Sequence, residues 1–231
     1  MKNPDELLIT VQPGSSTTAL VYPADHDPVG AVLILGHGAG AGQRHPWMVD
    51  CAGSLSQLGL DIVTFNFLYT EQRRGGPDRR PLLDLCYRAV IDAVRRHVER
   101  EHPPLFIGGK SMGGRIATHV AADNSDLDVS GLVLLGYPLH PPGRPTELRD
   151  AHLPAVGRPM LFVQGSRDAF GTPGELEPVL KTLSARASLH VVDGGDHSFK
   201  IGKKDPARQA ALLSEAHRTI VDWIRGVIAA G

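Results

Sequence analysis

Short apolar runs alternate along the chain with longer stretches whose apolar positions recur every three to four residues. A continuous apolar run such as Ala31–Leu35 is typical of a strand buried on both faces of a sheet. The three-to-four spacing within Pro81–Glu101 predicts an amphipathic helix instead. By these criteria the predicted strands are Leu7–Val11, Ala19–Tyr22, Ala31–Leu35, Leu60–Phe67, Leu105–Gly108, Gly131–Leu135, Pro159–Gln164 and Leu189–Val192, and the predicted helices are Trp47–Leu58, Pro81–Glu101, Met112–Ala122, Glu175–Leu183 and Pro206–Ala229.

This alternation predicts an α/β fold with one mostly parallel sheet and helices on both faces. The first two strands have only the turn Pro13-Gly14 between them, so the sheet is expected to start with an antiparallel pair. The connection from Leu135 to Pro159 is too short for a separate lid domain. Residues 1–231 are therefore interpreted as a single domain.

Composition narrows the possible partners. The formal net charge of −1 gives no basic field to attract nucleic acid or an anionic membrane, and no apolar stretch is long enough to span a bilayer. The N-terminus has no signal-peptide pattern and the two cysteines, Cys51 and Cys86, form no disulfide framework, so we expect a cytoplasmic protein with reduced thiols. The arginines at 73, 74, 79 and 80 are either a solvated loop or a basic rim beside a site.

The most informative motif is Gly109-Lys110-Ser111-Met112-Gly113, which directly follows an apolar run and precedes a helical stretch. In this context G-x-S-x-G is typical of a nucleophilic serine at a tight strand-to-helix turn. Side chains two residues before and after the serine would collide in such a turn, which explains the glycines. We therefore predict that Ser111 is a nucleophile.

A serine hydroxyl needs a base and a group that orients the base. His197 lies in a glycine-containing loop after the last predicted strand, and we predict that it is the base. Asp168 follows the strand that ends at Gln164 and is predicted to be the orienting carboxylate. Asp193 and Asp196 are the competing carboxylates.

The developing oxyanion needs backbone donors. One is predicted to be the amide of Met112, and the other to come from the small-residue loop after Leu35, where Ala39 is the first choice and Gly38 the second. A phosphate-binding loop is the rival interpretation, but the glycine spacing matches neither nucleotide motif. The chain contains no HExxH or CxxC, and we predict neither a metal nor a cofactor.

With these motifs in place, the sequence resembles the α/β-hydrolase superfamily, specifically its dienelactone-hydrolase-like branch. The similarity is greatest to small bacterial hydrolases that share a domain with a testis-expressed eukaryotic protein and with a scaffold subunit of a histone-acetyltransferase regulatory complex. It is carried by residues 37–40, 65–67, 109–115, 136–143, 164–168 and 195–199. The resemblance implies the triad order Ser111, Asp168, His197. Dienelactone hydrolases proper use cysteine where this chain has Ser111, so a dienelactone substrate is not implied.

We therefore expect a serine hydrolase that cleaves an ester-like bond of a small or exposed acyl substrate through an acyl-enzyme. A thioesterase or peptidase with the same triad, or a non-catalytic interaction module, is the alternative. Lys110 is expected either to form a structural salt bridge or to bias the local potential. Residues that are candidates for lining the substrate pocket are His37, Asn66, Lys110, Tyr137 and His140. A homodimer is left open.

Overall fold

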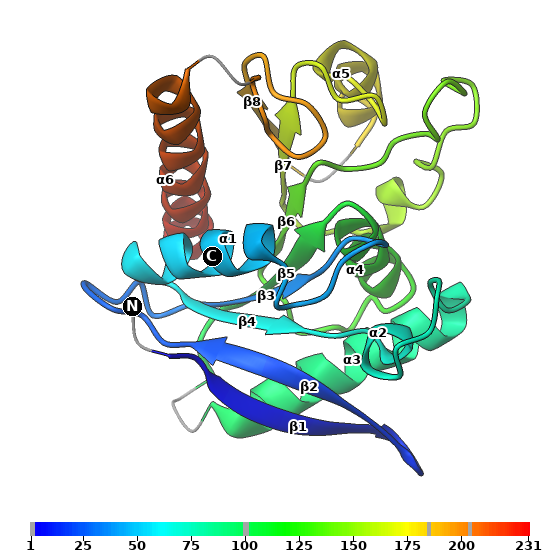
Figure 1. The fold of residues 1–231 in the computed structure, drawn as a ribbon, viewed down its shortest axis with the longest axis vertical. Coiled ribbons are helices and arrows are strands. Elements are labelled where there is room, and N and C mark those ends of the chain that lie inside the picture. Colours follow the sequence, from blue (N-terminus) through cyan, green and yellow to red (C-terminus); the bar gives the residue numbers. More distant parts are fainter. Residues whose placement is uncertain (1–2, 99–101, 184–185, 203–204) are drawn as a thin grey trace.

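The computed structural model describes residues 3–98, 102–183, 186–202 and 205–231. Its centre is a twisted sheet with the strand order β1-β2-β4-β3-β5-β6-β7-β8. The strands are β1 Asp5–Gln12, β2 Ser15–Tyr22, β3 Val32–Gly36, β4 Asp61–Phe65, β5 Leu105–Lys110, β6 Gly131–Leu135, β7 Met160–Gly165 and β8 Ala187–Val192. Strands β1 and β2 pair antiparallel, and from β4 to β8 every pairing is parallel. The twist turns β1 and β2 well away from the direction of β7 (Figure 1).

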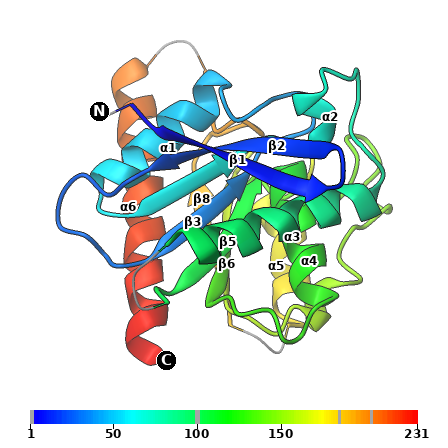
Figure 2. The same cartoon turned by 90° about the horizontal axis from the view of Figure 1, so that it is seen from below.

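Helices cover both faces of this sheet, as Figure 2 shows. Helices α1 (Pro46–Gln57) and α6 (Pro206–Ala230) pack on one face, and α3 (Arg80–His97) and α4 (Met112–Ala122) pack on the other. Helix α5 (Pro173–Leu180) adjoins β8, and the short α2 (Leu68–Glu71) follows β4. Each face has its own apolar core, so the central strands are buried on both sides. The α/β architecture and its antiparallel start are thereby confirmed.

Most element boundaries lie within two residues of the sequence prediction, and α4 and β6 agree at both ends. Strand β4 ends at Phe65 rather than Phe67, because the Phe67 N–H donates to the ring of His37 at 3.2 Å instead of to a strand. Helix α5 starts at Pro173, two residues earlier than predicted, because Thr172 and Glu175 form a capping box. The prediction that α3 reaches Glu101 falls partly on residues 99–101, which lie outside the described residues.

Cys51 in α1 and Cys86 in α3 are both free and buried, in agreement with the expected reduced thiols. Of the helices in the described ranges, none is both long enough and apolar enough to cross a membrane.

The contact that fixes the strand-to-helix turn after β5 is made by backbone atoms. A Cβ added to Gly109 would lie 2.2 Å from the carbonyl oxygen of Gly36 at the end of β3. A Cβ added to Gly113 in α4 would lie 2.1 Å from the same oxygen. Both distances are far below any real Cβ contact, so β3 can pass this close to the turn only because both positions are glycine.

This contact predicts the stability of two helical glycine variants. Gly113→Ala should lower the free energy of unfolding by about 2–3 kcal/mol, because the new methyl group forces β3 and α4 apart. Gly226→Ala in α6 is the matched control, since its Cβ would meet nothing within 4 Å. It should raise the free energy of unfolding by about 0.5–1 kcal/mol through helix propensity. Urea unfolding followed by circular dichroism measures both, and equal stabilities would show that the contact at Gly36 is not tight.

Candidate active site

Ser111 occupies the turn between β5 and α4, where the backbone is strained. Its φ of 52° and ψ of −114° are unusual for a residue with a side chain. Hydrogen bonds hold the turn on both sides: the Ser111 N–H donates to Leu135 O at 2.9 Å, and the Arg115 N–H donates to Ser111 O at 3.1 Å. The strain is thus maintained by the surrounding structure, and the serine side chain is left partly exposed at the tip.

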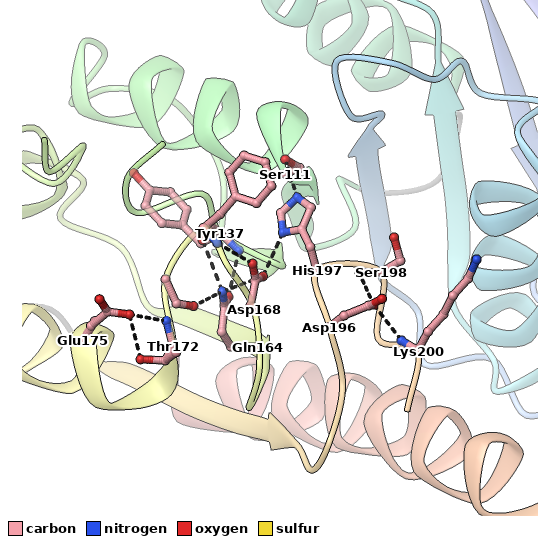
Figure 3. Close-up of polar contacts among 12 residues, drawn as sticks. Ser111, Tyr137, Gln164, Asp168, Thr172, Glu175, Asp196, His197, Ser198 and Lys200 are labelled. Atoms are coloured by element: carbon pink, nitrogen blue, oxygen red, sulfur yellow. Dashed lines mark hydrogen bonds and ion pairs between the residues drawn. The ribbon is translucent and has the colours of Figure 1, made fainter. Parts of the chain in front are cut away.

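The structure brings Ser111, His197 and Asp168 together from three separate segments. His197 Nε2 lies 2.9 Å from Ser111 Oγ, and His197 Nδ1 lies 2.8 Å from Asp168 Oδ2. Figure 3 shows the imidazole between the hydroxyl and the carboxylate. Since the carboxylate accepts at Nδ1–H, Nε2 carries the lone pair that faces the hydroxyl. This arrangement allows the serine to pass its proton to the histidine.

Two residues that sequence reasoning missed hold Asp168. The Gln164 side chain is fully buried at the end of β7 and donates from Nε2 to Asp168 Oδ2 at 2.9 Å. The Phe170 N–H donates to Asp168 Oδ1 at 2.8 Å, and the Phe170 ring lies against the imidazole of His197 with centroids 4.2 Å apart. Asp168 is only 1% exposed. The sequence signal for this support is an amide side chain at the end of a strand, four residues before the acid, as in Gln164-Gly165-Ser166-Arg167-Asp168.

Neither competing carboxylate contacts the imidazole. Asp196 accepts from the backbone N–H groups of Ser198 at 2.8 Å and Lys200 at 2.9 Å, so it folds its own loop (Figure 3). Asp193 forms an exposed ion pair with Arg208. Of the three candidate carboxylates, only Asp168 is hydrogen-bonded to His197 in the described part of the chain.

Hydrogen bonds set the orientation of the peptide between Gly38 and Ala39 in the loop after β3. The Gly38 carbonyl accepts from His37 Nδ1 at 2.8 Å and from the Ala41 N–H at 3.1 Å. Because the carbonyl and the following N–H of a trans peptide point in opposite directions, the Ala39 N–H points away from His37. Tyr69 Oη donates to Ala39 O at 3.0 Å and fixes the next peptide as well.

Ala39, Gly38 and Met112 all line the cavity that contains Ser111. Within the described residues, neither the Ala39 N–H nor the Met112 N–H donates to a protein atom. Met112 is the first residue of α4, where an N–H has no partner within the helix and favours negative charge.

His37 was expected to line the pocket, and this prediction is wrong. Its side chain is fully buried, and its Nε2 accepts from the Phe67 N–H at 3.2 Å, so the ring must be neutral. Burial lowers its pKa to about 4, which keeps it neutral at physiological pH. His37 therefore supports the loop of Gly38 and Ala39 from behind.

Three other predicted pocket residues also lie behind the cavity wall rather than in it. Asn66 links the loop after β3 to α2, accepting from the Gln43 N–H at 2.9 Å and donating to Glu71 at 2.7 Å. Tyr137 is buried, and its hydroxyl donates to Arg149 O at 2.7 Å. His140 is buried with its ring toward Glu175. These polar side chains organise loops and do not face the cavity.

Lys110 does line the cavity, but the expected salt bridge is absent among the residues that the structure describes. Its ammonium faces the rings of Trp47 and Phe199 at 5.7 and 5.6 Å from their centroids. The ammonium and the Asp168 carboxylate both flank Gly136. A Cβ built on this glycine would lie 2.7 Å from Lys110 Nζ and 3.5 Å from Asp168 Oδ2, so the lysine is close to the triad. Burial lowers the Lys110 pKa to about 8, opposed by the charges of Asp168 and Asp196.

The cavity itself has a volume of about 960 Å³, near the upper end for small-molecule sites. Ser111 and His197 open into it, together with apolar side chains from several elements and five cationic ones. The cationic residues of the lining are Arg80, Lys110, Arg115, Arg149 and Lys200. In the described ranges, no cluster of three or more His, Cys, Asp or Glu side chains is arranged to hold a metal ion.

Comparisons with known proteins agree with this architecture. An alpha-beta serine hydrolase homologue from Coxiella burnetii superposes with a TM-score of 0.71 at 19% identity, covering 96% of this chain and 98% of that one. A dienelactone hydrolase from Anabaena variabilis gives 0.68 at 22% identity over 94% and 97%. A serine hydrolase without a lid from Xanthomonas campestris gives 0.69 at 21% identity over 95% and 96%. At these identities, the similarity concerns the fold.

The sequence comparisons are more specific. Protein phosphatase methylesterase 1 of Pongo abelii is 31% identical over 112 residues, which are 46% of this chain. The match spans only 28% of that relative's own length. A family model described as an alpha/beta hydrolase domain matches residues 29–225. Because this match covers most of the sequence, the chain belongs to the α/β-hydrolase family of enzymes.

Proposed function

We propose that this hydrolase is a serine esterase that cleaves a carboxylic-ester bond through an acyl-enzyme. The observation that carries the proposal is the hydrogen-bonded series Asp168, His197, Ser111, with the serine at a cavity. A serine in this arrangement is activated by the adjacent base, and the carboxylate holds the base in the required tautomer.

The reaction follows from the positions of these groups. Ser111 Oγ attacks the ester carbonyl carbon while His197 Nε2 takes the hydroxyl proton. The amides of Met112 and Ala39, with Gly38 as the alternative to Ala39, stabilise the tetrahedral oxyanion. His197 then gives the proton to the departing alkoxide, and the acyl group stays on Ser111. A water molecule, deprotonated by His197, hydrolyses this acyl-enzyme and restores the serine.

An ester is favoured over other acyl substrates by the named sequence relative, which is a methylesterase. The cavity of about 960 Å³ has room for both the acyl and the alcohol parts of a small ester. The segment between β6 and β7 contributes Pro138 and Arg149 to the lining. Because this segment is too short to form a lid domain, we infer an open site suited to small or exposed acyl groups.

Replacement of the nucleophile tests the proposal directly. Ser111→Ala should reduce hydrolysis of p-nitrophenyl acetate by roughly 10⁴-fold or more, because no other group can form the acyl-enzyme. Ser198→Ala is the matched control, since Ser198 lines the same cavity and should keep nearly full activity. If Ser111→Ala retains more than about a tenth of the wild-type kcat, the nucleophile is another group.

The choice of carboxylate gives a second prediction. Asp168→Asn should lower kcat by about 10³- to 10⁴-fold with the fold preserved, because the amide favours the wrong imidazole tautomer. Asp193→Asn removes only an exposed ion pair with Arg208 and should leave kcat within about twofold. Steady-state kinetics of both variants provide the ranking, and the reverse order would contradict the role of Asp168.

Lys110 gives a prediction about pH. The rate kcat/KM should rise with pH, because only a neutral imidazole accepts the serine proton. With its pKa near 8, Lys110 is charged below that pH, and a neighbouring positive charge favours the neutral form of the base. Lys110→Met should therefore move the rising limb to higher pH, by about 0.5–1 unit.

The control for this shift is Lys200→Met, because Lys200 also lines the cavity but is exposed to solvent. Its removal should move the limb by less than about 0.2 unit, since solvent screens an exposed charge. Profiles of kcat/KM recorded for the three proteins decide the matter. A limb that stays in place in Lys110→Met would mean that the lysine does not act on the base.

A further inference from the structure

Two arginine side chains that the proposed mechanism does not use line the cavity beside Ser111. They are Arg115 on α4 and Arg149 in the segment between β6 and β7. Both are half-buried, and across the described residues no hydrogen bond or ion pair joins either guanidinium to a protein group. Each guanidinium carries a full charge and five donors, so both can bind a ligand that reaches the cavity.

Arg115 lies close to the nucleophile and lines the same cavity. It belongs to the first turn of α4, four residues after Ser111 at the N-cap, and its N–H donates to Ser111 O at 3.1 Å. Helical side chains lean toward the N-terminus, which carries the Arg115 side chain back toward the turn that holds Ser111. Its pKa is lowered, first by burial and then by the positive charges of Arg149 and Arg80.

Arg149 is held in place by its backbone rather than by its side chain. Its N–H donates to Leu139 O at 2.7 Å, and its carbonyl accepts from the buried Tyr137 hydroxyl at 2.7 Å. This explains what Tyr137 does, although it lies outside the cavity. The two bonds fix where the Arg149 side chain leaves the main chain while its guanidinium remains without a partner.

The surrounding acids are committed to other partners. Asp78 is paired with Arg74, and Arg80 is paired with Asp123 at 2.8 Å and Asp84 at 3.6 Å. The last acid of the lining, Asp50, is exposed on α1, which packs on the opposite face of the sheet from α4. No carboxylate of the described chain forms an ion pair with either arginine, although Asp84 acts on Arg115 and partly offsets the lowering of its pKa.

The positive charges of Arg80 and Arg115 also affect two nearby histidines. His119 and His152 stack with ring centroids 3.6 Å apart next to this cluster. The pKa of each is lowered to about 4 by burial, with contributions from Arg80 and Arg115. They are accordingly neutral at physiological pH, and the positive charge in this part of the molecule comes from the arginines.

We propose that Arg115 and Arg149 together form a subsite for a terminal oxyanion group of the substrate, a carboxylate or a phosphate, several bonds from the scissile ester. Paired guanidinium forks match the geometry of such groups, and the bonds are charge-assisted. The anion supplies the partner that the protein does not provide. This inference rests on the proposed esterase function and narrows it to anionic esters.

The kinetic test compares two esters of the same length. One is the p-nitrophenyl monoester of adipic acid, which ends in a carboxylate, and the other is p-nitrophenyl hexanoate, which ends in a methyl group. The ratio of their kcat/KM values should fall by about tenfold or more in Arg115→Gln and in Arg149→Gln. Hydrolysis of the hexanoate should stay within about twofold of wild type, because it does not use the arginines.

Arg144→Gln is the matched control, since Arg144 belongs to the same segment as Arg149 but is exposed and outside the cavity lining. It should leave the ratio unchanged. Arg149→Lys keeps the charge without the fork and should retain an intermediate ratio. A ratio in Arg115→Gln and Arg149→Gln equal to that of wild type would overturn the subsite while leaving the esterase proposal intact.

A binding measurement separates failure of the subsite from failure of the esterase proposal. At constant ionic strength, adipate or phenyl phosphate should raise the melting temperature of Ser111→Ala, whereas neutral 1,6-hexanediol should not. The anion that gives the larger rise identifies the preferred group. The rise should be lost when Arg115→Gln and Arg149→Gln are added. If neither ester is hydrolysed, an increase in melting temperature that requires the arginines still supports the subsite. If neither anion changes the melting temperature, the subsite is overturned.

Discussion

The close approach of the Gly36 backbone to the strand-to-helix turn is the constraint on which the rest of the site depends. Gly109 and Gly113 let β3 pass against both sides of the turn, with no space for a Cβ at either position. This contact forces the chain to reverse sharply at Ser111, whose φ of 52° is the result. It also brings the loop that begins after Gly36 alongside the first residue of α4, so that Ala39 and Met112 line one cavity.

The polar groups around this turn are each held by specific neighbours. His37 stays neutral because its ring accepts from a backbone N–H in a buried position, and the same ring fixes the peptide before Ala39. Asp168 is buried, with Gln164 and a backbone N–H donating to its carboxylate and the Lys110 ammonium nearby. A buried acid supported in this way orients the imidazole without needing an exposed counterion.

The sequence predicted the strands, the longer helices and the three residues at the centre, because each has a local signal, whereas the short α2 was missed. The glycines around Ser111 mark the turn, and α4 begins and ends where its apolar spacing indicates. Asp168 and His197 follow strands, and parallel strands end at one edge of the sheet. Such signals depend only on neighbouring residues, so they can be found without knowing the three-dimensional structure.

The supporting groups could not be predicted in the same way, because their roles depend on contacts between distant segments. His37 and Tyr137 follow strands on the active-site side, as a pocket residue would, yet both turn inward to hold loops. Lys110 has a nearby charge, as expected, but packs against aromatic rings from α1 and the histidine loop instead of a carboxylate. Only the fold reveals that Arg115 and Arg149 line one cavity from separate elements.

We propose that this constrained turn makes Ser111 a nucleophile activated by His197. The most direct measurement is the reaction of the protein with a fluorophosphonate, followed by intact-mass analysis and peptide mapping. We expect one adduct per chain, located on Ser111, and a rate of labelling at least about 10²-fold lower in His197→Ala. An adduct on a different residue, or labelling of Ser111 at the same rate without His197, would contradict it.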